Sequence, residues 1–220
     1  MPATPKPPPQ KARQARGTAP AKTARPAEAR LSRDAWLDAA YQAVAQGGFE
    51  QLRVLALADT LGVTRGSFYW HFTDHADLLA ALLARWRERE EALAVRLRAG
   101  FGGDPQTDLE GLLDTALAQS DEDLDNLRFE LALRSLGRRD PDVARLLLGV
   151  DRLRLALLES RFQRLTDDPQ TATDLAALFY LAIVGANQAL SRPGNPAQAK
   201  TYLKDLLARY LIRGEFPKHS

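Results

Sequence analysis

The sequence predicts an all-α protein with a small N-terminal three-helix head of helix-turn-helix type and a larger C-terminal helical body. Apolar residues recur at helical spacing along most of the chain, and no stretch alternates apolar and polar residues as a half-buried strand does. The apolar side chains are mostly Leu, Ala and Val, and aromatic residues make up only 7% of the composition, which favours helices over sheets.

The first segment of the chain differs in composition from the rest. Residues 1–30 contain seven of the thirteen prolines, and residues 1–33 carry eight basic residues against one acidic residue. Such a segment cannot bury enough apolar surface to offset the entropy lost on ordering. We therefore expect a disordered basic arm at 1–30, a head at 31–77 and a body at 78–220.

Three helices are predicted in the head. Ser32 is a suitable N-cap for the first, which ends at Gly47 and Gly48 because glycine adopts the left-handed C-terminal conformation readily. The second helix is expected at about 52–61, where Gly62 stops it. A very short third helix follows at about 64–71, with Thr64 as its cap.

The body is predicted to consist of longer helices. The first runs at about 75–99 and is capped by Thr73 or Asp74, and the glycines that follow it end it. Asp-Pro and Asn-Pro pairs mark the later boundaries, since Pro is well suited to the first helical position. The later helices are expected at about 106–119, 122–137, 141–165, 170–190 and 196–213.

The segment 52–72 has the pattern of a helix-turn-helix. Gly62 permits the tight turn, Val63 fills the wedge between the two helices, and Ala58 allows them to approach. Leu57 and Phe68 are expected to point inward. That leaves an outward set of arginine, hydroxyl and aromatic side chains, which can bind phosphates, thymine methyl groups or guanine acceptors. The alternative is that Tyr69, Trp70 and His71 form a buried aromatic cluster.

Residues 31–86 resemble the DNA-binding domain of the TetR family, on the segment GVTRGSFYWHF, the following Leu78-Leu79, and the preceding Trp36-Leu37…Ala40 helix with Gly-Gly-Phe. The resemblance implies that the third helix enters the major groove of double-stranded DNA. The positions that match the family's DNA contacts are Thr64, Arg65, Ser67, Tyr69, Trp70 and His71. Arg53, at the start of the second helix, would lie near a phosphate, and His75, at the start of the fourth, completes the set of predicted DNA-binding residues.

This chain departs from the family pattern at two positions and in charge. Leu52 stands where many members carry a capping Thr, and His75 stands where they usually carry Lys or Arg. Residues 31–86 hold four arginines against six carboxylates, so the head itself is not basic. Non-specific attraction to DNA is then expected to depend on the arm at 1–30.

The last two long helices are apolar on more than one side, which indicates burial on two sides. In the TetR family these helices pair with their copies in a homodimer whose twofold symmetry matches a palindromic operator. The alternative is a monomer in which both helices are central. The predicted dimer interface is Leu175, Phe179, Ala182, Ala186, Leu203, Leu206, Leu207 and Tyr210.

The resemblance also implies a small-molecule effector among the middle helices of the body. The sequence does not identify that molecule. The candidate lining residues are Trp86, Leu113, Phe129, Leu133, Phe162, Phe179 and Asn187, with Leu112, Arg128 and Glu130 as further candidates. Ordinary core packing explains the apolar ones equally well.

Several function classes lack support in the sequence. The chain has no cysteine, and His71 and His75 have no third ligand that would complete a zinc site. We found no phosphate-binding glycine loop, no nucleophile motif and no apolar span of membrane length. The expectation is a cytoplasmic protein that is not an enzyme and has no metal or cofactor.

The leading hypothesis is a ligand-responsive DNA-binding transcriptional regulator, a repressor that a small molecule releases from its operator. The first alternative is an architectural or constitutive DNA-binding protein without a small-molecule ligand. The second is an unrecognised helical enzyme. A pocket of ligand size in the body would favour the leading hypothesis, and a solid core would favour the first alternative.

Overall fold

The computed structural model describes residues 31–100, 102–117, 121–190 and 197–215, and within them it contains helices and no strand. The predicted arm at 1–30 lies outside the described residues. The helices are α1 (Arg33–Gly47), α2 (Val54–Thr60), α3 (Arg65–Phe68), α4 (His75–Ala99), α5 (Pro105–Leu117), α6 (Asp121–Gly137), α7 (Pro141–Phe162), α8 (Pro169–Leu190) and α9 (Ala197–Leu207), which continues into a π-helical turn (Ala208–Ile212).

Local capping signals explain several of the helix ends. The Ser32 hydroxyl accepts a hydrogen bond from the Ala35 N–H at 3.2 Å, and Gly48 ends α1 with a φ of 79°. Asp74 is the cap of α4, where its carboxylate accepts from the Asp77 N–H at 2.9 Å. The N-caps predicted for α1 and α4 are therefore confirmed.

Two elements of the head are shorter than predicted. Helix α2 begins at Val54, because Arg53 before it has an extended backbone (φ −117°, ψ 126°); Leu52 lies outside the helix and is buried in the core. Helix α3 ends at Phe68, so Tyr69, Trp70 and His71 lie in the turn that follows it. The Phe68 carbonyl accepts from both the His71 and the Phe72 N–H groups, at 2.9 and 3.0 Å, which tightens this turn.

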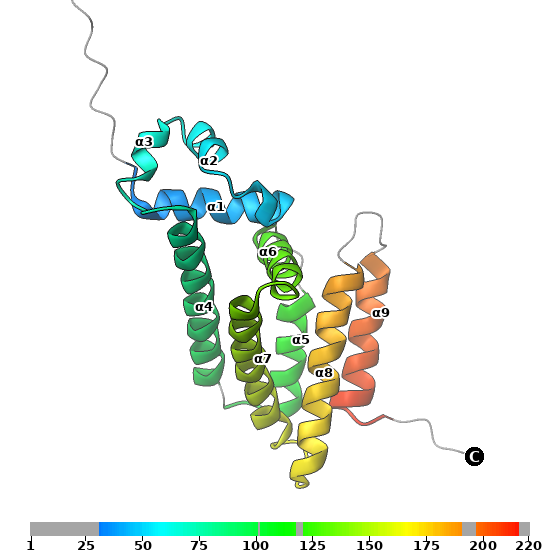
Figure 1. Ribbon diagram of the computed structural model, residues 1–220. Helices are drawn as coiled ribbons and strands as arrows, with labels where there is room; N and C mark the ends of the chain where they lie inside the picture. Colours follow the sequence, from blue (N-terminus) through cyan, green and yellow to red (C-terminus); the bar gives the residue numbers. More distant parts are fainter. Residues whose placement is uncertain (1–30, 101, 118–120, 191–196, 216–220) are drawn as a thin grey trace, which may run out of the picture. The chain divides into compact units, whose positions relative to one another are not determined.

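Helix α1 lies across the ends of α4 and α6 and contacts both (Figure 1). The first hydrophobic core follows from this arrangement, since it joins the head helices to α4, α6 and α7. Its members include Trp36, Phe68, Leu82, Phe129 and Val150. The core therefore continues across the predicted boundary between residues 77 and 78.

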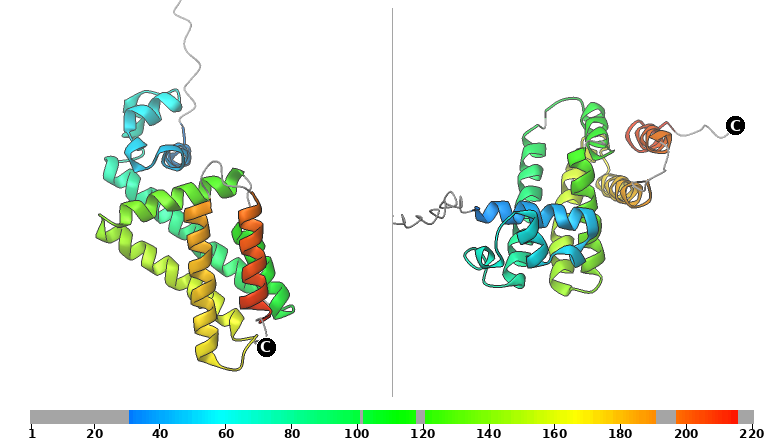
Figure 2. Two further views of the ribbon diagram at one scale, coloured as in Figure 1. Left: turned by 90° about the vertical axis from the view of Figure 1, so that its right-hand side faces the viewer. Right: turned by 90° about the horizontal axis from the view of Figure 1, so that it is seen from above.

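A second hydrophobic core lies among α5, the C-terminal half of α7, α8 and α9, with Leu109, Phe162 and Phe179 fully buried. Helices α8 and α9 run beside each other in both views of Figure 2. No described helix is both long and apolar enough to span a membrane.

Candidate nucleic-acid interface and internal cavity

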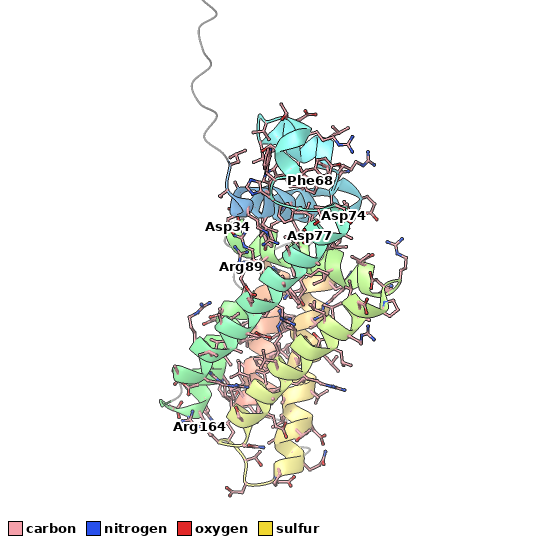
Figure 3. All side chains as sticks on the ribbon, turned by 60° about the vertical axis from the view of Figure 1, so that its left-hand side comes forward. Asp34, Phe68, Asp74, Asp77, Arg89 and Arg164 are labelled. Carbon is pink, nitrogen blue, oxygen red and sulfur yellow. The ribbon has the colours of Figure 1, made fainter. Side chains whose placement is uncertain are left out.

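A single aromatic side chain holds α3 in the head. Phe68 is fully buried, its ring meets Trp36 edge-on at 5.4 Å between centroids, and it stacks on Phe72 at 5.4 Å. Figure 3 shows Phe68 between the head helices. Because a four-residue helix has almost no stability of its own, this packing sets the position of α3.

The opposite side of α3 and of its following turn faces solvent. Thr64, Arg65 and Gly66 are exposed, and Tyr69 and Trp70 are 51% and 80% exposed. Ser67 and His71 are half-buried. The alternative of a sealed aromatic cluster is therefore wrong for Tyr69 and Trp70, and the surface predicted to meet DNA is accessible.

Arg65 is held in place by its neighbour one helical turn later. Its Nη2 donates to the Tyr69 hydroxyl at 2.8 Å, and its guanidinium carbon lies 5.7 Å from the centre of the Tyr69 ring. The pair presents a planar donor and an aromatic edge to solvent. Both groups suit contact with a base edge or a phosphate.

Arg53 and His75 lie at the starts of α2 and α4. The Arg53 Nε donates to the Glu50 carbonyl at 3.1 Å, and Arg53 is exposed. The His75 Nε2 lies 2.7 Å from the Leu52 carbonyl oxygen, which ties the start of α4 to the segment before α2. His75 thus has a structural contact that the sequence pattern did not indicate.

A cavity of about 610 Å³ lies among α4, α5, α6, α7 and α8. Its apolar wall includes Trp86, Leu112 and Phe179, and its polar wall includes Glu130 and Asn187. These five residues were among the sequence candidates for effector contact.

The remaining effector candidates lie away from this wall. Phe129 and Leu133 are fully buried in the first core, and Leu113 and Phe162 are fully buried in the second. Phe129 stacks on Tyr41 of α1 at 4.6 Å. Helical periodicity places these side chains inside but does not distinguish a packed core from the wall of a cavity.

An ion-pair network that the sequence analysis missed borders the cavity. Arg154 of α7 donates to Glu90 of α4 at 2.9 Å and to Glu130 of α6 at 2.8 Å. Arg134 of α6 donates to Glu130 at 2.7 Å, and to Asp151 at 2.7 Å. The network thereby joins three helices, and the Tyr180 hydroxyl of α8 completes it by donating to Asp151 at 2.6 Å.

Burial and charge act in opposite directions on Glu130. Burial alone would raise the pKa of its carboxyl group, but the hydrogen bonds and positive charges of Arg154 and Arg134 outweigh it and hold the pKa below its ordinary value. Both guanidinium groups have raised pKa values despite burial, because of the same carboxylates. The i,i+4 spacing of Glu130 and Arg134 on α6 was the available sequence signal.

The predicted dimer interface is divided between the interior and the surface. Phe179, Ala186 and Leu207 are buried in the second core of their own chain. Five further candidates are half-buried: Leu175, Ala182, Leu203, Leu206 and Tyr210. The large exposed apolar side chains of α8 and α9 are Leu178 (56%), Leu181 (65%) and Tyr202 (66%), none of which was among the candidates.

Comparison with known proteins points to one family. The family model of bacterial regulatory proteins, tetR family, matches residues 37–82. The chain is 30% identical over 152 residues to the HTH-type transcriptional regulator BetI of Stenotrophomonas maltophilia, an alignment that covers 67% of this chain and 77% of BetI. It is 34% identical over 86 residues to the HTH-type transcriptional regulator AcrR of Shigella flexneri, where the alignment covers 39% of this chain and only 40% of AcrR.

A solved structure shares the fold. A protein from Saccharomonospora viridis, solved in complex with choline, superposes with a TM-score of 0.69 and 18% sequence identity, over 85% of this chain and 98% of that protein. Both sequence relatives are transcriptional regulators by name.

Proposed function

The chain belongs to the TetR family of bacterial transcriptional regulators, and on that premise we propose that it is a homodimeric repressor that a small molecule releases from a palindromic operator. The exposed surface of α3 and its turn is the observation that carries the proposal, because it presents Arg65, Tyr69 and Trp70 to solvent on a fixed support. Such a protein acts in the cytoplasm, where the DNA is.

The DNA contacts in this proposal are Arg53, Thr64, Arg65, Ser67, Tyr69, Trp70, His71 and His75. The side chains on α3 and its turn would read base edges in the major groove, and Arg53 would meet a phosphate. The His75 Nε2 faces the Leu52 carbonyl oxygen and so must donate to it, which means that Nδ1 could donate to a phosphate only when the ring is doubly protonated. A dimer that covers both half-sites excludes other proteins from the same duplex, which is the simplest route to repression.

The cavity supports a ligand-responsive regulator over an architectural protein without a ligand. A volume of about 610 Å³ is within the range of small-molecule sites, and its lining combines apolar side chains with a few convergent polar groups. The choline complex of a protein with the same fold also favours a small-molecule site.

Two residues of the cavity wall also contact the head, which gives the ligand a route to the DNA-binding surface. Asn126 of α6 accepts a hydrogen bond from the Tyr41 hydroxyl of α1, and the Arg89 guanidinium of α4 lies 5.2 Å from the centre of the Tyr41 ring. Figure 3 labels Arg89 on α4 close to α1. A ligand that prefers another placement of Arg89 or Asn126 would shift the position of α1, and with it the distance between the two heads of a dimer.

Selection of bound sequences from random duplex DNA tests the core of this proposal. The full-length protein should enrich a palindrome whose half-site centres are separated by about one helical turn or a multiple of it. Enrichment of a single, non-repeated site would contradict the dimer, and recovery of no preferred sequence would contradict the regulator.

A further inference from the structure

The charges on the cavity wall are unequal. Four guanidinium groups line it, from Arg89, Arg96, Arg134 and Arg154. Arg134 is also paired with Asp151, which lies outside the lining, and the wall itself contributes the two carboxylates of Glu90 and Glu130. Both carboxylates already accept hydrogen bonds from Arg154, and Glu130 also accepts from Arg134. A cation that entered would have to displace a guanidinium from its carboxylate and would still face a net positive wall.

The other two arginines have no carboxylate partner among the described residues. Arg89 and Arg96 lie seven residues apart on α4, two helical turns along the same face, with Leu93 and Leu97 of the cavity wall beside them. Both residues line the cavity and are exposed, so this part of its wall is open to solvent. Within residues 31–100, 102–117, 121–190 and 197–215 neither forms an ion pair, whereas Arg87 on the same helix pairs with Glu91.

The apolar part of the cavity is deeper. Trp86 is 5% exposed, Phe179 is fully buried, and Leu157 and Leu158 of α7 are 5% and 7% exposed. An alkyl or aromatic group placed against these side chains would leave water at a gain of roughly 25 cal/mol per Å² of apolar surface buried. The cavity therefore joins an apolar interior to a cationic opening.

We propose, on the basis of the function proposed above, that the effector is an amphipathic anion. Its apolar portion packs against Trp86 and Phe179, and its anionic group binds Arg89 and Arg96 at the opening. A planar guanidinium is well suited to a carboxylate, sulfonate or phosphate group. Because Arg89 also covers the Tyr41 ring, an anion that draws Arg89 toward the cavity weakens the packing of α4 against α1.

Titration calorimetry with three probes of equal alkyl chain length tests whether the cavity prefers an anionic, a neutral or a cationic ligand. The probes are octane-1-sulfonate, 1-octanol and octyltrimethylammonium. The two ionic probes are used below their micelle concentrations and the alcohol below its solubility limit, at constant ionic strength with the full-length protein. Two charge-assisted contacts predict that the sulfonate binds roughly tenfold tighter than the alcohol, and that the ammonium binds more weakly than either.

Two double variants locate the charge recognition on α4. Arg89→Gln with Arg96→Gln should lower sulfonate affinity to that of the alcohol and leave alcohol binding unchanged. The control, Arg87→Gln with Arg98→Gln, removes the same charge from side chains of α4 that do not line the cavity, and should bind the sulfonate as the wild type does.

Three results would overturn the proposal: no sulfonate binding up to millimolar concentration, equal or tighter binding of the ammonium, or unchanged sulfonate affinity in the Arg89/Arg96 variant. The DNA selection described above uses no ligand, so an enriched palindrome alongside any of these results would leave the regulator intact and reject only the anion.

Discussion

At Arg65 the guanidinium group is oriented before DNA is present. The hydrogen bond to the Tyr69 hydroxyl and the contact with its ring restrict a side chain that would otherwise lose much of its rotamer freedom on binding. Trp70, at 80% exposure, lies one residue further along the same turn. In the proposed complex, pre-organisation of this kind would add to affinity without any additional interaction with DNA.

Arg65→Ala should weaken binding to the selected operator by about 1–3 kcal/mol, roughly 5- to 150-fold, if the guanidinium reads a base edge. Fluorescence anisotropy with operator and random duplexes measures both affinities. Tyr69→Phe keeps the ring but removes the hydrogen bond, so a smaller loss is expected. An operator affinity equal to that of the wild type would refute the role of Arg65.

Tyr41 offers a second prediction at this scale. Tyr41→Phe removes the hydrogen bond to Asn126 and should lower the free energy of unfolding by about 1 kcal/mol. It should also reduce the ratio of operator affinities measured without and with octane-1-sulfonate, because this hydrogen bond joins the cavity wall to the head. Asn126→Ala should have the same effect, and the double variant should add little to either. Additive effects would show that the two residues act separately.

At the scale of single helices, local signals predicted the ends more reliably than the faces. Ser32 and Asp74 cap their helices as expected, since a cap depends on a few adjacent residues. The faces depend on partners distant in the sequence. Helix α8 is apolar on more than one side, and periodicity alone did not reveal that Phe179 faces inward and Leu181 outward.

The same limit applied to the cavity. Trp86, Phe179 and Asn187 were predicted to contact the effector and line the cavity, whereas Phe129 is used to hold α1 through Tyr41. The network of Glu90, Glu130 and Arg154 escaped prediction because its members come from three different helices. The exposed side of α3 and its turn was easier to predict, since the helices of the head are consecutive in the sequence.

The exposed apolar residues of α8 and α9 offer a test of dimerisation that leaves the core of the protomer intact. Leu181→Glu with Tyr202→Glu should give a particle of monomer mass by light scattering, because both side chains are about two-thirds exposed and would be buried between copies. Leu206 and Tyr210 are half-buried, so charging them would also disturb the fold. Leu148→Glu on α7, at 48% exposure, is the control and should remain dimeric. A dimer that persists in the first variant would reject this surface.

At the scale of the whole molecule, Glu130 links α6 to Arg154 of α7, and through Arg154 to α4. The Arg134–Asp151 pair is a second link between α6 and α7. Glu130→Gln leaves two partly buried guanidinium groups with too little negative charge, and should reduce the free energy of unfolding by about 2–4 kcal/mol at pH 7. Urea denaturation of both proteins measures the difference.

The pH dependence of this difference follows from the lowered pKa of Glu130. A carboxyl group with a folded-state pKa below its unfolded value of about 4.3 stabilises the fold fully above that pH. The contribution is lost as the pH falls through the folded-state pKa. The gap between wild type and Glu130→Gln should therefore narrow below about pH 4, and a constant gap would argue against the ionised pair.

The last prediction at the scale of the whole chain concerns the salt dependence that residues 1–30 give to DNA binding. The described head carries more carboxylates than arginines, so most non-specific attraction to DNA is assigned to the arm. Removal of residues 1–30 should flatten the log–log dependence of affinity on salt by roughly 0.9 for each phosphate that the arm neutralises. A uniform decrease of affinity at all salt concentrations would indicate an interaction that is not electrostatic.

The position of α3 depends on Phe68, which faces inward, so the stability of the fold and the recognition of DNA would rest on different side chains. Folding draws on the inward ring, whereas the side chains that would meet the bases contribute little to the core. The outward positions can therefore be exchanged as a set at small thermodynamic cost. If the chain acts as proposed, duplicated copies would therefore acquire distinct operators while each kept an intact scaffold.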